Sequence, residues 1–302
     1  MTIVYILLGL FVLVCLLYVL CLRCRRRKDW ERFRKWRFAH RGFHDKPRIP
    51  ENSIPAFRRA VQCGFGAELD VHLMKDGHLA VIHDASLLRT AGVDVLVEDL
   101  TAEELKNYKL EGTEHHIPLL DEVLPIFAGK APLIVELKAE RGNADALTAA
   151  ACALLDKYKG KYMVESFDPW CLMWLWHNRP QVLRGQLSEN FLRHGDGASL
   201  PGAVRWVLGN LLMNSWTRPD FIASRFENMW VPLGIGVAGF LSGMALGVPK
   251  IGLFLADPFV IMLNPAVSMS TRPDVSVIAI AIVETLLFLA AGLWTSANIH
   301  YE

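Results

Sequence analysis

Residues 67–84 read AELDVHLMKDGHLAVIHD, and this stretch decides the fold. It contains two short apolar runs, Ala67–Leu73 and Leu79–His83, of the kind that form buried strands. Between them, Lys75-Asp76-Gly77 predicts a tight turn, because Asp-Gly is a strong turn signal. Acids and histidines stand within these runs or at their ends, where a plain core would make them costly. An active site at the ends of parallel strands needs such residues, so the pattern indicates an enzyme.

Strand-like and helix-like segments alternate along the rest of the chain. Further strands are predicted at Trp36–His40, Leu133–Lys138, Tyr162–Phe167, Val182–Leu187 and Asp220–Phe226. Helices are predicted at Ile54–Cys63, Thr101–Tyr108, Leu120–Phe127, Ala144–Tyr158, Asp168–His177 and Ala203–Met213. Ser53 and Thr101 are suitable N-caps for the first two of these helices. Seven strands alternating with helices predict an α/β fold whose parallel sheet closes as a TIM (β/α)8-type barrel.

The N-terminal end is predicted to be a membrane anchor. Ile3–Leu22 has no charge, is long enough to cross a bilayer, and is followed by the basic run Arg23–Lys28. A cleaved signal peptide would carry its charge ahead of the apolar run and end in small residues. We therefore favour an uncleaved transmembrane anchor at residues 1–24 over a signal peptide or a buried core helix. The positive-inside rule then places the following domain in the cytoplasm.

A basic linker and an apolar tail flank the predicted barrel. Residues 25–35 form the linker, which is either a solvated topology signal or a contact for anionic headgroups. Residues 36–228 form the barrel, and residues 229–302 form the tail. Within the tail, Met229–Val248 has no charge and Val275–Trp294 has Glu284 alone. We favour membrane spans, because neither segment has a polar face; the alternative is an irregular barrel end, with Pro249–Ala256 as its eighth strand.

Composition excludes some classes of function. The net charge is +1, and the strongest basic run lies beside a predicted membrane span, so nucleic acid is not an expected partner. The six cysteines are scattered without metal-ligand spacing, and we predict that they are reduced and structural.

Three acids in two of the predicted strands indicate a metal site. Glu68 and Asp70 are two residues apart, so both side chains point to the same face of a strand. Glu136 lies near the end of another apolar strand. Exposed residues on one strand face are the simpler explanation of Glu-x-Asp alone. Three acids in apolar surroundings instead favour an oxygen-rich pocket for Mg²⁺ or Ca²⁺.

Two histidines at strand ends indicate acid–base chemistry beside these acids. His40 and His83 can flank a metal, one taking a proton from the nucleophile and the other protonating the leaving oxygen of a phosphodiester. Arg41 offers a bidentate fork for phosphate oxygens, and Lys138 offers a point charge. The remaining histidines lack such neighbours and are predicted to be surface or packing residues; they are His44, His72, His78, His115, His116 and His177.

In this order the motifs resemble the glycerophosphodiester phosphodiesterase family. They are His40-Arg41-Gly42, Pro50-Glu51-Asn52-Ser53, Glu68-Leu69-Asp70, Lys75-Asp76-Gly77, His83-Asp84 and Glu136-Leu137-Lys138. The resemblance covers about residues 36–228 and implies a TIM barrel and a divalent cation. It implies that Glu68, Asp70 and Glu136 bind the metal with Glu51 close by, and that His40 and His83 are the acid–base pair. It also implies that Arg41 and Lys138 hold phosphate and that Phe167 lines a glycerol pocket.

The implied reaction is hydrolysis of a glycerophosphodiester to sn-glycerol 3-phosphate and an alcohol, by a membrane-anchored bacterial-type member of that family. Two other functions stay open. A lysophospholipid or another lipid phosphodiester is an alternative substrate, given the anchor and the apolar tail. The third hypothesis is a catalytically inactive membrane-associated barrel. The family's usual Trp-Thr strand, which closes the barrel, has no counterpart after Phe226.

Overall fold

The structure is a computed structural model that describes residues 13, 24–25, 27–189, 191, 200–224 and 299–301. The chain divides into two compact units, Met1–Ala223 and Ser224–Glu302. Within the second unit the described residues beyond Ser224 form one short strand, β8 (Ile299–Tyr301). All that follows concerns the first unit.

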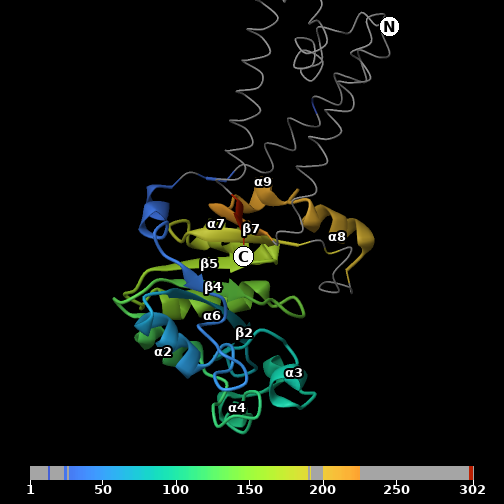
Figure 1. The fold of residues 1–302 in the computed structure, drawn as a ribbon. Helices are drawn as coiled ribbons and strands as arrows, with labels where there is room; N and C mark the ends of the chain where they lie inside the picture. Colours follow the sequence, from blue (N-terminus) through green and yellow to red (C-terminus); the bar gives the residue numbers. More distant parts are fainter. Residues whose placement is uncertain are drawn as a thin grey trace, which may run out of the picture. The chain divides into compact units, whose positions relative to one another are not determined.

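A curved sheet forms the centre of this unit (Figure 1). Its strands lie in the order β1-β2-β4-β5-β6-β7, and the pairs from β1 to β6 are parallel. Their bounds are β1 (Phe38–Ala39), β2 (Gly66–Leu73), β4 (Leu133–Leu137), β5 (Tyr162–Ser166), β6 (Arg184–Ser188) and β7 (Phe221–Ser224). These strands confirm the predicted parallel α/β architecture of a TIM-barrel-like fold. The predicted eighth strand, Pro249–Ala256, lies outside the described residues.

One predicted strand does not join the parallel order. β3 (Leu79–Val81) pairs antiparallel with β2 and lies off the main path of the sheet. The turn at Lys75–Gly77 is the reason: Gly77 has φ +86°, which closes the chain back onto β2 as a hairpin. Counting Leu79–His83 as one of the barrel strands was therefore wrong, although the predicted turn is confirmed.

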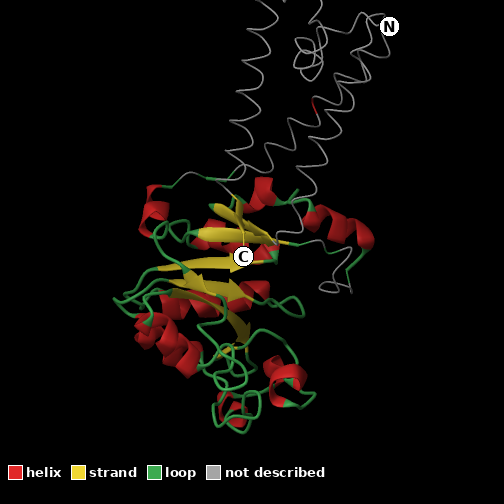
Figure 2. Ribbon diagram, in the orientation of Figure 1, coloured by secondary structure: helices red, strands yellow, loops and turns green. Residues whose placement is uncertain are grey.

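Helices and short helical turns cover the sheet (Figure 2). They are η1 (Lys28–Arg32), α2 (Ile54–Gln62), α3 (Leu88–Ala91), η2 (Val97–Asp99), α4 (Ala102–Leu105), α5 (Leu120–Phe127), α6 (Ala144–Leu155), α7 (Pro169–Asn178), α8 (Gly202–Gly209) and α9 (Asn214–Thr217). Ser53 Oγ caps α2 by accepting from Ala56 N, as predicted. The helix predicted at Ala203–Met213 ends early, as α8, because Gly209 and Asn210 end it and Leu211 adopts φ +58°. α9 begins only after the predicted end and was not predicted.

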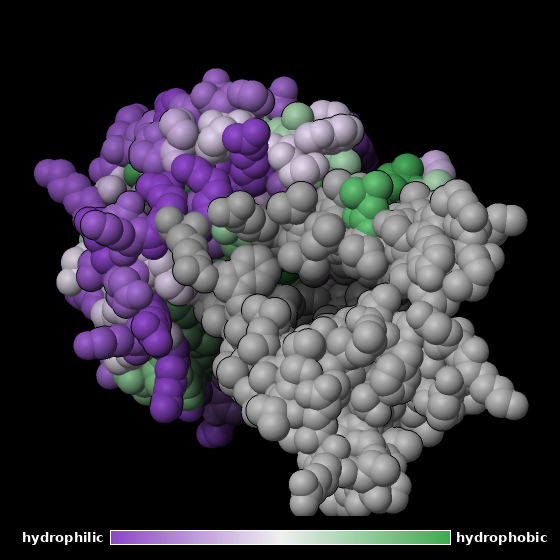
Figure 3. All heavy atoms as spheres, turned by 90° about the horizontal axis from the view of Figure 1, so that it is seen from above, coloured by the Kyte–Doolittle hydropathy of each residue, from purple (hydrophilic) through white to green (hydrophobic). Residues whose placement is uncertain are grey.

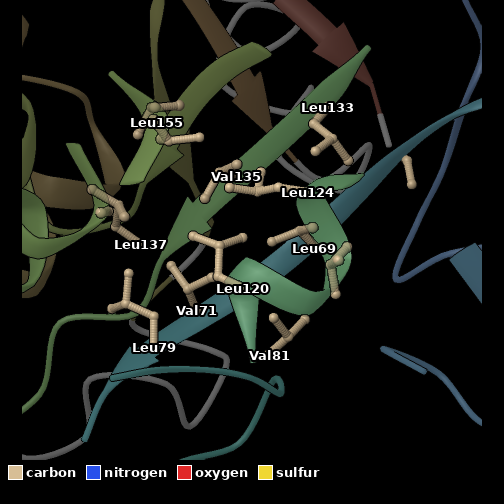
Figure 4. Close-up of a cluster of buried hydrophobic side chains, with 14 of the residues drawn as sticks. Leu69, Val71, Leu79, Val81, Leu120, Leu124, Leu133, Val135, Leu137 and Leu155 are labelled. Atoms are coloured by element: carbon tan, nitrogen blue, oxygen red, sulfur yellow. The ribbon is translucent and has the colours of Figure 1, made fainter. Parts of the chain in front are cut away.

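The core lies between the sheet and its helices (Figure 4). Leu69 and Val71 of β2 and Val135 of β4 are fully buried there, against Leu120 of α5. Because side chains alternate along a strand, the intervening residues of β2 point to the other side of the sheet. Those intervening residues are Glu68 and Asp70, so the packing of the core determines where the acids lie.

No helix within the described residues is long and apolar enough to cross a membrane. Apart from Leu13 and Cys24, the predicted anchor lies outside those residues, as do both predicted spans of the tail. The four described cysteines are free thiols, of which Cys24, Cys152 and Cys171 are buried and Cys63 is exposed.

Candidate active site

Three buried carboxylates converge on the inner side of the sheet. Glu68 and Asp70 come from β2, and Glu136 comes from β4, where it is the direct partner of Asp70 in the parallel register. Glu68 and Glu136 are each 4% exposed, and Asp70 is fully buried. One oxygen of each carboxylate lies within 4.8 Å of the others. The expectation of a three-acid cluster is confirmed, and the alternative of exposed strand-face acids is wrong.

Lys138 lies directly beside this acidic cluster. Its Nζ is 2.6 Å from Glu136 Oε1 and 3.1 Å from Asp70 Oδ1. Phe167 follows β5, and its ring centroid lies 5.7 Å from the same ammonium. The lysine therefore contacts two of the acids and carries positive charge between them and the aromatic ring.

The turn after β1 brings His40 and Arg41 to the cluster. Arg41 adopts φ +54°, an uncommon conformation for a residue with a side chain, and its backbone N–H donates to Glu68 Oε2 at 2.9 Å. His40 Nε2 lies 3.9 Å from the same oxygen. Gly42 has φ +78°, and a Cβ there would lie 2.9 Å from Ala56 Cβ, so the turn requires glycine.

The segment before α2 supports the cluster from a second side. Asn52 Nδ2 donates to Asp70 Oδ2 at 2.8 Å. Glu51 Oε1 accepts from Arg41 Nη1 at 2.9 Å and from Arg89 Nη2 at 2.7 Å. Glu51 therefore holds Arg41, the residue that follows His40, in position beside the cluster.

His83 follows β3 and is held by an acid next to it in sequence. Its Nδ1 lies 2.6 Å from Asp84 Oδ1, which leaves Nε2 as the nitrogen free of this contact. Asp84 Oδ2 in turn accepts from Arg89 Nε. Since Arg89 also binds Glu51, one arginine joins the loops that carry the two candidate histidines.

The acids influence one another's protonation strongly. Burial, together with the charges of Asp70 and Glu136, raises the pKa of Glu68 well above its ordinary value. Burial raises the pKa of Glu136 to about 8 despite the charge of Lys138. Burial acts in the same direction on Asp70, but Lys138 and His83 outweigh it and lower the pKa of that carboxyl. Three carboxylates this close favour either protons or a cation between them.

The donor set fits a hard divalent cation. Glu68 Oε1 is buried and accepts no hydrogen bond, and neither Asp70 Oδ1 nor Glu136 Oε1 has one beyond its ion pair with Lys138. Buried carboxylate oxygens without donors are costly, and oxygen ligands of this kind are those that Mg²⁺ and Ca²⁺ prefer.

Comparison with known proteins agrees with this geometry. Residues 40–208 match the model of the glycerophosphoryl diester phosphodiesterase family. The match covers more than half of the chain and includes every motif described above. The chain belongs to this family.

Individual members of the family show the same similarity. A glycerophosphodiester phosphodiesterase from Bacillus altitudinis is 44% identical over 108 residues, which cover 33% of this chain and 43% of that protein. Lysophospholipase D GDPD1 of Rattus norvegicus is 35% identical over 146 residues, covering 44% of this chain and 45% of that protein. The chain thus matches less than half the length of these curated relatives.

A solved structure shows a similar fold. A phosphodiesterase from Oleispira antarctica, in complex with the product sn-glycerol-3-phosphate, superposes with a TM-score of 0.52 at 24% identity. The superposition covers 67% of this chain and 80% of that one.

The predicted site residues of this family member mostly lie where the sequence placed them. Glu68, Asp70 and Glu136 form one cluster, and Lys138 and Arg41 each approach Asp70, with Arg41 Nε at 3.7 Å from its Oδ2. His40 lies 3.9 Å from Glu68, and His83, which Asp84 holds, is near enough for its charge to lower the pKa of Asp70.

Sequence reasoning gave no positioning role to several residues of this site, although Asn52 and Asp84 belong to its motifs. Asn52, Asp84 and Arg89 hold Asp70, His83 and Glu51, respectively. His72 was expected to be a surface or packing residue; it is buried, but its Nδ1 contacts Glu98 Oε1 and its Nε2 contacts the carbonyl oxygen of His83. One sign of this role was visible in the sequence, because His72 follows Glu68 and Asp70 at every second position and therefore points to the same face of β2.

Proposed function

We propose that the protein hydrolyses glycerophosphodiesters to sn-glycerol 3-phosphate and an alcohol, using a divalent cation. The observation that carries this proposal is the convergence of Glu68, Asp70 and Glu136 within 4.8 Å, with His40 at 3.9 Å from Glu68. Membership of the family and the names of its 44%-identical relatives support the proposal.

In this proposal Glu68, Asp70 and Glu136 hold the cation, either Mg²⁺ or Ca²⁺. When bound, the cation supplies positive charge to the phosphate oxygens. Glu51 acts on the site through Arg41, because its Oε1 accepts a hydrogen bond from Arg41 Nη1. We assign it to positioning rather than to ligation, since three cationic side chains already engage its two oxygens.

The two histidines move the protons of the reaction. One imidazole takes a proton from the nucleophile, and the other gives a proton to the leaving oxygen. Asp84 holds Nδ1 of His83, which directs Nε2 to the reacting groups. Arg41 and Lys138 bind the phosphate oxygens, and Phe167, beside Lys138, lines the glycerol side of the pocket.

The direct test is turnover of a panel of soluble glycerophosphodiesters with and without chelator. Glycerophosphocholine should release glycerol 3-phosphate in the presence of Mg²⁺ or Ca²⁺ and not after chelation. His83→Ala should abolish the release, whereas His177→Ala, at an exposed histidine of α7, should leave it unchanged. A wild-type chain that releases nothing with either metal would instead support the catalytically inactive barrel.

A lysophospholipid is the second candidate substrate. It is favoured by the similarity to the rat lysophospholipase D and by the exposed apolar side chains of α8, Val204 and Trp206. Lysophosphatidylcholine in place of glycerophosphocholine separates the two, because its phosphate-bearing product is lysophosphatidic acid rather than glycerol 3-phosphate.

We further propose that the enzyme is membrane-anchored, of bacterial type, through residues 1–24. Residues 25–35 link the anchor to a catalytic barrel at 36–228 in the cytoplasm, and residues 229–302 add further membrane segments. This proposal is supported by the 20 uncharged residues of Ile3–Leu22 and the basic run after them. Carbonate extraction, together with protease protection of the barrel in sealed vesicles, tests both parts.

A further inference from the structure

A second charged cluster lies at the opposite end of the sheet from the candidate active site. Arg184 is the first residue of β6, and Asp220 directly precedes β7. The strands β1, β2, β4, β5 and β6 run parallel, so Arg184 marks the amino ends of the strands, whereas the active-site turns follow their carboxyl ends. Groups at this end take no part in the proposed reaction.

Three arginines gather around one tryptophan here. The guanidinium carbons of Arg25, Arg184 and Arg218 lie 4.7, 4.9 and 5.1 Å from the centroid of the Trp176 ring. A cation over an aromatic face is favourable, but three like charges around a single ring repel one another. This repulsion requires negative charge nearby.

The described residues supply too little negative charge for the cluster. Asp220 lies 4.0 Å from Arg25 Nε and 3.9 Å from Arg27 Nη1. Within the described part of the chain no ion pair joins the side chain of Arg184 or Arg218 to a carboxylate. One buried acid therefore faces several arginines, and the cluster keeps an excess of positive charge.

Arg184 also lacks a hydrogen-bond acceptor for one of its side-chain nitrogens. Arg184 is fully buried; its Nε and Nη2 donate to the carbonyl oxygens of Thr217 and Arg218. Its Nη1 is buried without a hydrogen-bond partner, and so is Nη1 of Arg25. Two nitrogens of Arg184 therefore hold the chain before β7 through hydrogen bonds, whereas the third, Nη1, has no such role. Burial lowers the pKa of Arg184 to about 10 against the influence of Asp220, and Arg25 and Arg27 lower it further.

We propose that Arg25, Arg184 and Arg218, around Trp176, form a binding site for the phosphate of an acidic phospholipid headgroup, separate from the active site. A phosphate held by the accessible parts of Arg25 and Arg218 balances the charge of the cluster, including that of the buried Arg184. Arginine suits this role, because its planar fork binds phosphate in bidentate fashion. Arg218 is exposed, and the side chain of Arg25 is 36% exposed, so a headgroup can approach.

The surroundings favour a lipid over a free anion as the source of the phosphate. The stretch 200–218 has no acid, and its tryptophans Trp206 and Trp216 are 53% and 64% exposed. Exposed tryptophans beside basic residues are typical of segments that lie at the headgroup level of a membrane. Seen from above, hydrophobic residues lie next to hydrophilic ones on the part of the surface that the structure describes (Figure 3). Arg25 also follows Leu22, the end of the predicted anchor, by only three residues.

The test is calorimetric titration of the detergent-solubilised full chain with dihexanoyl phosphatidic acid, dihexanoyl phosphatidylcholine and inorganic phosphate. Phosphatidic acid should bind at least about tenfold more tightly than either of the others. Arg25→Gln and Arg218→Gln should each weaken that binding about fivefold, as expected for one basic side chain at a headgroup. Arg34→Gln, in the same basic linker but exposed and away from the cluster, is the matched control and should have no effect.

Three results would overturn the proposal. An equal loss in Arg34→Gln would mean diffuse attraction to the basic linker. Equal binding of inorganic phosphate would mean a site for a free anion. Loss of binding in Glu136→Gln, with none in Arg218→Gln, would mean that the lipid occupies the active site. Near-ultraviolet circular dichroism of each variant confirms that it is folded, and Arg218→Gln, at an exposed position, keeps the test valid if Arg25→Gln misfolds.

Discussion

Lys138 Nζ lies 2.6 Å from Glu136 Oε1, at the point where the three-acid cluster is expected to bind a cation. The ammonium is 3.1 Å from Asp70 as well, and both acids raise its pKa above the ordinary value even though burial opposes this. A bound cation and Lys138 therefore compete for the same oxygens. The lysine would be free to meet phosphate once a metal takes its place.

Replacing this lysine should separate metal binding from catalysis. In Lys138→Met the cation loses its competitor, so the affinity for Mg²⁺ or Ca²⁺ should rise about tenfold, as expected for removal of a nearby like charge. Turnover should fall by about 10²–10³-fold, because a charge facing the phosphate is lost. Metal titration by calorimetry and steady-state kinetics measure the two effects. Weaker metal binding in the variant would contradict the competition.

Metal should stabilise the fold, and increasingly so at higher pH. Glu136 has a pKa of about 8 in the folded chain against an ordinary value of 4.5, so the folded state binds more protons in this range. The free energy of unfolding of the metal-free protein should therefore decrease, by roughly 1–3 kcal/mol, as pH rises from 4.5 to 8. Cation at 100 times its Kd should restore about 2.7 kcal/mol and raise the melting midpoint by about 5–10 °C.

Thermal melts with metal and with chelator at pH 5 and pH 8 measure this dependence. Glu136→Gln should remove the metal effect and weaken the pH dependence, of which Glu68 keeps a part. Glu103→Gln, which changes an exposed glutamate paired with Lys106, should keep both. A metal effect that is the same at both pH values would show that the cluster is already ionised without metal.

The cap of α2 is a test of the fold apart from catalysis. Ser53 Oγ accepts from Ala56 N at 3.3 Å and donates to the carbonyl oxygen of Pro50 at 2.6 Å, in the segment that carries Glu51 and Asn52. Ser53→Ala should lower the free energy of unfolding by about 1–2 kcal/mol. Ser53→Thr, which keeps the hydroxyl, is the control in denaturant unfolding. Equal stability of Ser53→Ala and wild type would mean that the cap contributes nothing.

Local signals in the sequence predicted much of this fold. The apolar run around Leu69, the Asp76-Gly77 turn and the Ser53 cap are each determined by neighbouring residues, and the structure has all three. β3 was wrongly counted among the barrel strands, because a hairpin arm and a barrel strand have the same apolar pattern. The helix of α8 was predicted to run on to Met213, because local apolar character outweighed Gly209 and Asn210, and α9 was not predicted.

The acids of the site could be predicted from the sequence, but the residues that hold them in position could not. Glu68, Asp70 and Glu136 stand out because carboxylates interrupt apolar strands. Asn52 and Arg89 do not, since each acts through a partner distant in sequence, Asp70 at 18 residues and Glu51 at 38. Such contacts exist only after the chain folds, and ordinary polar residues in loops give no sign of them beforehand.

The pH dependence of turnover should identify His83 as the proton acceptor. Burial and the charge of Lys138 lower its pKa below the ordinary 6.5, so the ring is neutral at pH 7 and able to accept a proton. The acid limb of kcat/KM should lie below pH 6.5, and His83→Ala should lose about 10²–10⁴-fold in rate together with that limb.

Two variants should move the limb in opposite directions. Asp84→Asn removes an acid that raises the pKa of His83, so the limb should shift to lower pH, whereas Lys138→Met should shift it to higher pH. Rate profiles from pH 4.5 to 9 measure both shifts, and movement of the limb in the same direction in both variants would assign it to a group other than His83.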